Sequence, residues 1–168
     1  MNGAGVGKLG DAEPRFQMST YNEITFKNKL SFRFLLHLKA GGQNVNLTTL
    51  QNDFGGTSAD FDKVTNKAGL PDGIYRITKV GSTAEEFVQN SGYLRLREVA
   101  LYYTVGKMPL GPIKTLRFGV SANNYFTKTN YRNYDPEVSN FGTGFSTNVD
   151  VMPFPSSKRA SFHVLVEF

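Results

Sequence analysis

Residues that could do chemistry are few in this chain of 168 residues, and their types and spacing form no catalytic or metal-binding pattern. The sequence has two histidines, His37 and His163, and no cysteine. The lack of cysteine excludes disulfide frameworks, thiol catalysis and thiolate-ligated zinc or iron–sulfur sites. His163 has only Glu167 as a partner on one face of a predicted strand, whereas catalysis or metal binding needs several convergent groups. We therefore predict structural histidines, no metal, no cofactor and no enzymatic activity.

Two further motifs suggest ligand chemistry without meeting its requirements. The stretch GAGVGK at residues 3–8 resembles a phosphate-binding loop, but that pattern needs glycine where Asn2 stands and Ser or Thr where Leu9 stands. The segment NDFGGTSADFD carries three aspartates that could bind calcium: Asp53, Asp60 and Asp62. Their spacing is not that of an EF-hand loop, so we favour a solvated surface loop.

Composition narrows the class of protein and of partner. The chain is 39% hydrophobic and 20% charged, which suits one folded domain and not a disordered chain. A net charge of +5 and a pI near 9.4 leave nucleic acid and acidic lipid open as partners. The basic residues are spread over several predicted strands, and no nucleic-acid-binding motif is present, so we predict no nucleic-acid partner. Apolar runs are too short for a membrane-spanning helix, and we see no signal peptide or plug segment.

The elements expected to position these residues are β-strands in which apolar and polar residues alternate. From Leu30 to Ala40 every even-numbered residue is apolar and most odd-numbered residues are polar, which is the period of a β-strand. At 11 residues, the segment matches the roughly 9–11 residues that a strand needs to cross a membrane.

Four more segments follow the same pattern: Phe16–Lys27, Tyr93–Val105, Thr115–Phe126 and Ala160–Phe168. In the second of these, Leu94 and Leu96 are out of phase with Val99 and Leu101. This phase change predicts a β-bulge near Arg97 or Glu98. The expected fold is therefore all-β, with about five antiparallel amphipathic strands.

The connections between these strands alternate in length. Residues 27–29 and 106–114 form short turns, whereas the segments at about 41–91 and 128–158 are long and polar. Short turns at one end and long loops at the other are typical of an outer-membrane β-barrel with extracellular long loops. The polar strand faces then line the lumen, and three basic residues become candidates for its wall: Arg33, Lys39 and Arg117. An alternative class of function remains open, a soluble β-sandwich that binds carbohydrate through its loops.

The order of four motifs resembles the C-terminal end of SusC/RagA-type TonB-linked outer-membrane receptors. They are GDAEPRF, GYLRLREVALYYTVG, LRFGVSANNYFTKTNYRNYDPEVS and VDVMPFPSSKRASFHVLVEF. The family shows SYLRLKN-like, N-x-F-T-x-T-x-Y…DPE and D…YP…R-x-F…F motifs in this order. The chain departs from it at Phe154, where Tyr is common, and at His163, where Gly is common.

The resemblance implies that the chain is the C-terminal segment, residues 1–168, of a large barrel of about 22 strands. Such receptors import glycans, oligosaccharides or peptides across the outer membrane of Gram-negative, Bacteroidetes-type cells. The implied partners are outer-membrane lipid, a SusD-like surface lipoprotein and the TonB complex, the last through N-terminal parts absent from this chain. The resemblance also makes the last strand the signal read by the barrel-assembly machinery, carried by four residues on one face: Phe162, Val164, Val166 and Phe168.

Overall fold

The computed structural model describes residues 7–106, 113–137 and 148–168. Residues 3–6 of the phosphate-loop-like stretch, most of the 106–114 turn and part of the 128–158 segment lie outside the described residues. The chain divides into two units. The loop unit contains residues 1–16, 40–92 and 130–155, and the sheet unit contains residues 17–39, 93–129 and 156–168.

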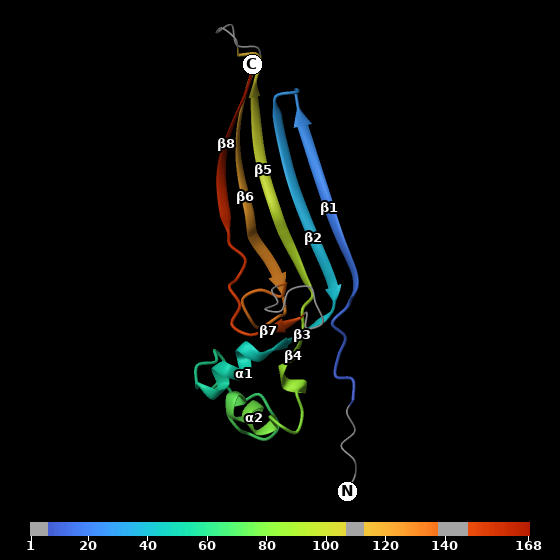
Figure 1. The fold of residues 1–168 in the computed structure, drawn as a ribbon, viewed down its shortest axis with the longest axis vertical. Helices are drawn as coiled ribbons and strands as arrows, with labels where there is room; N and C mark the ends of the chain where they lie inside the picture. The colour runs from blue at the N-terminus through green and yellow to red at the C-terminus, as the bar shows by residue number, and fades with distance from the viewer. Residues whose placement is uncertain (1–6, 107–112, 138–147) are drawn as a thin grey trace. The chain divides into compact units, whose positions relative to one another are not determined.

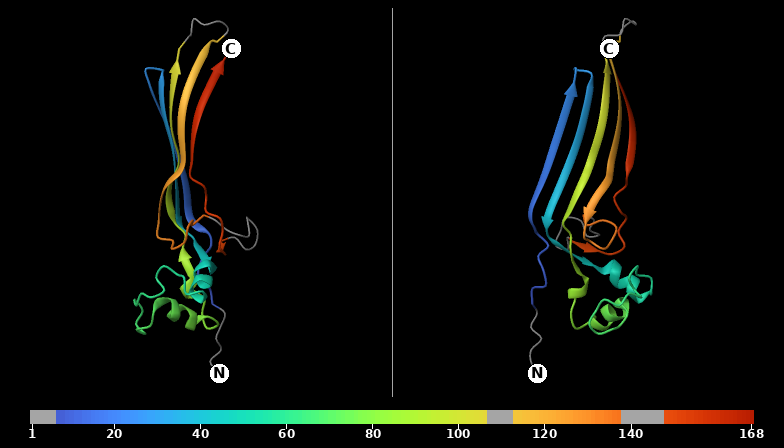
Figure 2. Two further views of the ribbon diagram at one scale, coloured as in Figure 1. Left: turned by 90° about the vertical axis from the view of Figure 1, so that its left-hand side faces the viewer. Right: turned by 180° about the vertical axis from the view of Figure 1, so that it is seen from behind.

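The sheet unit is one antiparallel sheet of five long strands. They are β1 (Pro14–Phe26), β2 (Leu30–Gly41), β5 (Tyr93–Val105), β6 (Thr115–Thr129) and β8 (Arg159–Glu167). Their order in the sheet is β1-β2-β5-β6-β8, so each strand lies beside the next long strand along the chain (Figure 1). Figure 2 shows these strands as a single curved layer. The predicted strands and the predicted all-β class are confirmed.

The two faces of the sheet follow from its register. Phe32 pairs with Leu101, which pairs with Val120, which in turn pairs with Phe162. Side chains of directly paired residues lie on the same face, so this row and its neighbours build one continuous apolar face. The arrangement extends the alternation seen in Leu30–Ala40 across the sheet.

The predicted bulge is present and restores this face. Leu35 pairs with Glu98 and Leu36 pairs with Leu96, which leaves Arg97 as the extra residue on β5. On the other side of β5, the register with β6 shifts at the same place, where Asn124 adopts a positive φ of 58°. Because the bulge changes the phase by one residue, Leu94 and Leu96 join the apolar face.

The loop unit has regular structure that the alternation did not indicate. It contains β3 (Gln43–Asn46), α1 (Leu47–Phe54), α2 (Asp72–Lys79), the 3₁₀ turn η1 (Glu85–Phe87), β4 (Val88–Asn90) and β7 (Val149–Asp150). Strand β3 lies between β4 and β7 and pairs with β7 in parallel. These elements span two to eight residues, too few to produce a recognisable hydrophobic period. Among the described residues, no helix is long and apolar enough to cross a membrane.

Buried polar groups, more than apolar ones, fill the interior of the loop unit. Apolar side chains such as Phe87 and Tyr131 are buried there, but a larger set of buried residues is polar or charged. That set includes Asn44, Asn46, Thr48, Asp53, Asp72, Arg76 and Asp150. Because a buried polar group without a partner destabilises the fold, this interior depends on hydrogen bonds between its polar groups, although Asn44 Oδ1 has no partner among the described residues.

Candidate functional site

The buried carboxylate of Asp150 joins the two long connecting segments inside the loop unit. It accepts hydrogen bonds from the hydroxyl groups of Thr48 and Tyr131, the latter at 2.7 Å, and from the Asn133 amide at 2.6 Å. Burial raises the pKa of the Tyr131 hydroxyl far above its ordinary value, and the hydrogen bond to Asp150 raises it further. Tyr131 is therefore a neutral donor that holds Asp150 in place.

A buried ion pair holds α2 against the end of α1. The Arg76 guanidinium donates from Nε and Nη2 to both carboxylate oxygens of Asp53, at 2.6 and 2.7 Å. It also donates to Asp60, at 2.9 and 3.2 Å, and Ser58 donates its hydroxyl to Asp53. Hydrogen bonds to Asp53 and then to Asp60 raise the pKa of Arg76 above its usual range. The expected solvated loop is wrong for Asp53, whose side chain is fully buried because it pairs with Arg76.

The same carboxylates leave little capacity for calcium. Asp53 and Asp60 are both occupied by Arg76, and Asp60 also accepts from Arg132 Nη1 at 3.1 Å. Asp62 is exposed, as the surface-loop prediction expected. Within residues 7–106, 113–137 and 148–168, no cluster of three or more His, Asp or Glu side chains is placed to hold a metal ion.

Asp72 fixes the turn that precedes α2. Its carboxylate accepts from the Thr65 backbone at 3.0 Å, from the Thr65 hydroxyl at 2.7 Å and from the Asn66 amide at 2.7 Å. These bonds, the Thr65 backbone bond foremost, lower the pKa of Asp72 to about 2. At neutral pH, Asp72 is therefore ionised and satisfied by donors of its own segment.

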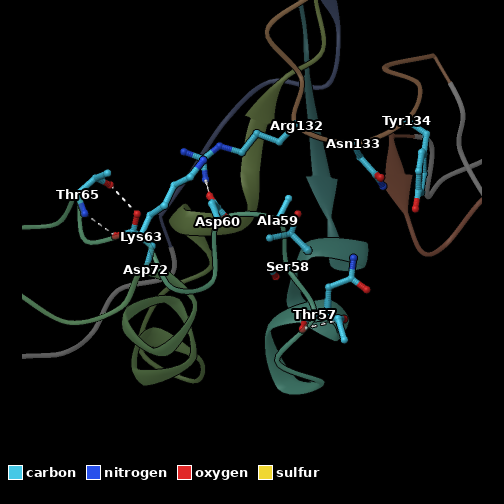
Figure 3. Close-up of a pocket in the computed structure, with 12 residues that line it drawn as sticks. Thr57, Ser58, Ala59, Asp60, Lys63, Thr65, Asp72, Arg132, Asn133 and Tyr134 are labelled. Carbon is cyan, nitrogen blue, oxygen red and sulfur yellow. Dashed lines mark hydrogen bonds and ion pairs between the residues drawn. The ribbon is translucent and has the colours of Figure 1, made fainter.

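A polar cavity of about 690 Å³ opens among these groups within the loop unit. Its wall contains hydroxyl and amide side chains, two acidic and two basic residues, and one tyrosine: Thr49, Asn52, Thr57, Ser58, Asp60, Lys63, Thr65, Asp72, Arg132, Asn133 and Tyr134. Figure 3 shows Arg132, Asn133 and Tyr134 extending from one segment, with Arg132 directed toward Asp60. Tyr134 is 72% exposed among the described residues.

On the polar face of the sheet unit, two of the predicted basic residues meet at one tyrosine. The guanidinium carbons of Arg33 and Arg117 lie 5.1 and 4.5 Å from the centre of the Tyr102 ring, within cation–π range. Arg33 Nη2 also donates to Glu23 at 2.9 Å. The Nε atoms of both arginines are buried without a hydrogen-bond partner among the described residues.

A glycine makes room for the Tyr102 ring. Tyr102 pairs directly with Gly119 across the strands, and a Cβ atom at Gly119 would lie 2.2 Å from Tyr102 Cδ1. The ring therefore covers the glycine, an arrangement known to compensate for glycine in a strand. His163 lies against the same ring, at 5.6 Å, and its Nε2 contacts the Ser121 hydroxyl at 2.8 Å, so Ser121 and not Glu167 is its hydrogen-bond partner.

The third basic candidate and the other histidine lie in a second cluster of this face. Lys39 is buried on β2, opposite Tyr93 of β5. His37 Nδ1 accepts from Arg97 Nε at 2.8 Å, and its ring meets the Tyr93 ring edge-on at 5.4 Å. These contacts give His37 a packing role on the sheet.

The residues of the expected assembly signal lie on β8 or directly after it, and their side chains are exposed. Phe162, Val164 and Val166 share the apolar face of β8, with 69, 51 and 41% of their surfaces exposed. Phe168 follows the end of β8 and is 70% exposed. These residues therefore lie near one another, whereas the basic candidates Arg33, Lys39 and Arg117 lie on the opposite, polar face of the sheet.

Sequence reasoning missed the groups that build the loop unit. Arg76 and Asp150 carry its buried interactions, and neither was a candidate. Local signals lay at the two helices: Asn46 caps the start of α1, and at α2 Asp72 in the first turn and basic residues in the last turn complement the helix dipole.

In amino-acid sequence this chain is similar to TonB-dependent receptors. A TonB-dependent receptor, P3, of Formosa agariphila is 28% identical over an alignment of 139 positions, which covers 78% of this chain and 14% of the relative. A second, P39, from the same organism is 32% identical over 87 residues, 49% of this chain and 8% of the relative. The chain thus matches only about a seventh of the length of the first relative. No family model matches it.

Solved structures share the fold. The RagAB peptide importer in its open-open state matches 94% of this chain with a TM-score of 0.65 and 17% identity, over 17% of that chain. Its closed-closed state matches 83% of this chain with a TM-score of 0.56. The expected resemblance is therefore confirmed, in sequence to TonB-dependent receptors and in fold to the RagAB importer, and so is the expected fold class of long antiparallel strands.

Proposed function

We propose that this chain, which is similar to TonB-dependent receptors in sequence and to the RagAB importer in fold, is the C-terminal segment of an outer-membrane nutrient importer. The observation that carries the proposal is the continuous apolar face of the five-stranded sheet. Its large apolar side chains are extensively exposed, for example Phe118, Val120 and Phe162. A contiguous apolar surface of this kind marks a membrane or protein contact.

Lipid is the occupant that suits this face best. Four of the five strands have 12 or more residues, and at about 3.3 Å per residue they exceed the length of a tilted membrane strand. The exposed edges of β1 and β8 would pair with further strands of the same barrel, since unpaired strand edges are not tolerated in lipid. The 168 residues would thus supply one sector of the wall.

The alternative of a soluble β-sandwich is less consistent with the structure. A sandwich needs a second sheet large enough to cover the first. The second sheet among the described residues has strands of only two to four residues. It is too small to cover an apolar face that extends along strands of 9 to 15 residues.

The remaining assignments follow from the barrel. The polar face would line the lumen, with Arg33, Lys39 and Arg117 in its wall, and the loop unit would be the extracellular part. The cargo would be a glycan, oligosaccharide or peptide, taken up with a SusD-like lipoprotein and driven through TonB. The RagAB structures, described as a peptide importer, support import and a two-component assembly. Phe162, Val164, Val166 and Phe168 would be read by the barrel-assembly machinery.

Two adjacent leucines provide a matched test of the barrel. Leu36 lies on the apolar face opposite Leu96, whereas Leu35 lies on the polar face opposite Glu98. In the intact receptor, Leu36→Arg should cost about 2–4 kcal/mol if it faces the centre of the bilayer. Leu35→Arg should be tolerated, because it adds a charge to a water-filled lumen.

The measurement is the fraction of receptor that reaches the outer membrane in a heat-modifiable, folded form. We expect a marked loss for Leu36→Arg and near wild-type assembly for Leu35→Arg. Equal losses for both would indicate a protein-packed sheet, and a loss for Leu35→Arg alone would reverse the assignment of the faces. Either result would refute the proposal.

A further inference from the structure

A cavity of about 350 Å³ lies on the polar face of the sheet, where β5 carries its bulge. Its wall contains residues of four strands: Leu35, Arg97, Glu98, Asn123, Asn124 and Arg159. Two of them, Arg97 and Asn124, lie where the strand register shifts. Bulges often redirect side chains beside functional sites. The volume lies near the lower end of the roughly 300–1,000 Å³ common for ligand pockets, so a ligand here must be small.

Two opposite charges in this wall have no partner in the described part of the chain. The Glu98 carboxylate and the Arg159 guanidinium form no ion pair or hydrogen bond there, either with each other or with a third group. Glu98 pairs with Asn123, which pairs with Arg159, so two strand spacings, about 10 Å at the backbone, separate them. The cavity therefore has an acidic side on β5 and a basic side on β8.

The two asparagines of the wall add hydrogen-bond acceptors to its acidic side. Asn123 and Asn124 donate their Nδ2 groups to the backbone carbonyls of Arg97 and Ser157, at 3.2 and 3.3 Å. Their Oδ1 atoms have no partner among the described residues and remain as acceptors. Two amide oxygens and the Glu98 carboxylate together suit an ammonium group, which has three donors and no acceptor.

The rest of the wall suits a carboxylate and an apolar group. The Arg159 guanidinium has the planar donor fork that binds carboxylates. Arg97 already donates to His37, so it contributes positive charge to this side rather than a free donor. Leu35 is the one apolar side chain that lines the cavity among the described residues.

A ligand with a single charge would satisfy only half of this wall. An anion would leave Glu98 and the asparagine oxygens without partners, and a cation would leave Arg159 without one. A zwitterion with adjacent ammonium and carboxylate groups satisfies both sides at once. An α-amino acid carries these two groups on one carbon atom, and its side chain is free to contact Leu35.

We propose that this cavity binds a free α-amino acid with an apolar side chain. Glu98 and the two asparagine oxygens bind its ammonium group, Arg159 binds its carboxylate, and Leu35 contacts its side chain. The site adds a small ligand to the proposed import function. It rests on that function only in that the polar face of the sheet must line a water-filled lumen, where such a ligand has access.

The test is binding of L-leucine to the intact receptor in detergent, measured by ligand-detected NMR titration. Two matched probes each lack one charge. The first, 4-methylpentanoate, keeps the carboxylate without the ammonium, and the second, 3-methylbutylamine, keeps the ammonium without the carboxylate. We expect L-leucine to bind at least about tenfold more tightly than either probe, because each probe loses a hydrogen-bonded charge.

Substitutions in the wall assign each charge of the ligand to its partner. Glu98→Gln should weaken L-leucine about tenfold without weakening 4-methylpentanoate, which has no ammonium to lose. Arg159→Gln should weaken L-leucine about tenfold without weakening 3-methylbutylamine. Glu167→Gln and Lys158→Gln are the matched controls, because both residues are exposed near these positions on the chain and neither lines the cavity. Each control should change the affinity by less than about twofold.

Three results would overturn the proposal: no binding of L-leucine, a singly charged probe that binds as tightly as L-leucine, or controls that weaken binding as much as the wall substitutions. The Leu35/Leu36 comparison separates this failure from failure of the import function. A receptor that assembles as that comparison expects, but binds no L-leucine, retains the barrel and loses only this site.

Discussion

The Asp53–Arg76 pair allows the stability of the loop unit to be tested at one buried contact. Both side chains are almost fully buried, at 0 and 3% exposure, and the guanidinium contacts both carboxylate oxygens of Asp53. Removing one partner of a buried pair typically costs about 3–5 kcal/mol, because the other charge stays buried without compensation. Asp60 still contacts Arg76 after Asp53→Ala. We therefore expect the lower end of that range, about 3 kcal/mol.

Hydrogen exchange of backbone amides in α1 and α2 of the intact receptor measures this local stability. A loss of about 3 kcal/mol corresponds to exchange about 100-fold faster, at 1.36 kcal/mol for each factor of ten. Asp62→Ala is the control, because Asp62 is exposed, and its effect should stay within about 0.5 kcal/mol.

A double variant tests the physical reason. In Asp53→Leu combined with Arg76→Met, no buried charge is left unpaired at this position, and apolar replacement of such pairs is often neutral. Exchange should then return to within about tenfold of wild type. If Asp53→Ala leaves exchange unchanged, or if the double variant is as damaging as the single one, the pair does not hold the two helices together.

Three further perturbations have outcomes fixed by the structure. Gly119→Ala should destabilise the folded receptor by about 1–3 kcal/mol, because the new methyl group overlaps the Tyr102 ring. The measurement is the urea midpoint of unfolding in detergent. Adding Tyr102→Ser should restore the midpoint, and an unchanged midpoint in Gly119→Ala alone would contradict the packing. The carboxylate of Asp72 stabilises the folded loop unit fully at pH values above its unfolded pKa of about 3.9. This contribution to stability should be lost as the pH falls toward its folded pKa of about 2. Exchange of the α2 amides should therefore be faster in Asp72→Asn than in wild type at pH 5, with the difference vanishing near pH 2; a constant difference would refute the linkage. Deleting Phe168 should lower the yield of assembled receptor more than Phe126→Ala does, and equal small effects would leave these residues with lipid contact only.

The sheet could be predicted because each long strand carries its own alternation of apolar and polar residues, and this alternation recurs in several segments. Every second residue of Leu30–Ala40 is apolar, and the change of phase between Leu96 and Val99 located the bulge before any pairing was known. A regular period of two over so many residues has few structural explanations.

The loop unit could not be predicted, because its stability depends on pairs far apart in sequence. Arg76 meets Asp53 across 23 residues, and Thr48 meets Asp150 across 102. A polar residue that will be buried with a distant partner has the same local sequence signal as one that will be solvated. Asp53, expected on a solvated loop, is the clearest case.

The parallel pairing of β3 with β7 has a consequence for how such a protein can be altered. Val45 pairs with Val149 and Asn46 with Asp150, so two segments separated by the whole of β5 and β6 form one body with one interior. Replacing one segment with its counterpart from a relative would remove one side of the buried contacts that cross between the two, such as Thr48 with Asp150 and Asn44 with the Pro136 carbonyl. We therefore expect a transplant of this unit between relatives to fold best when it carries residues 40–92 and 130–155 together, because a chain that receives only one of them loses one partner of each crossing contact.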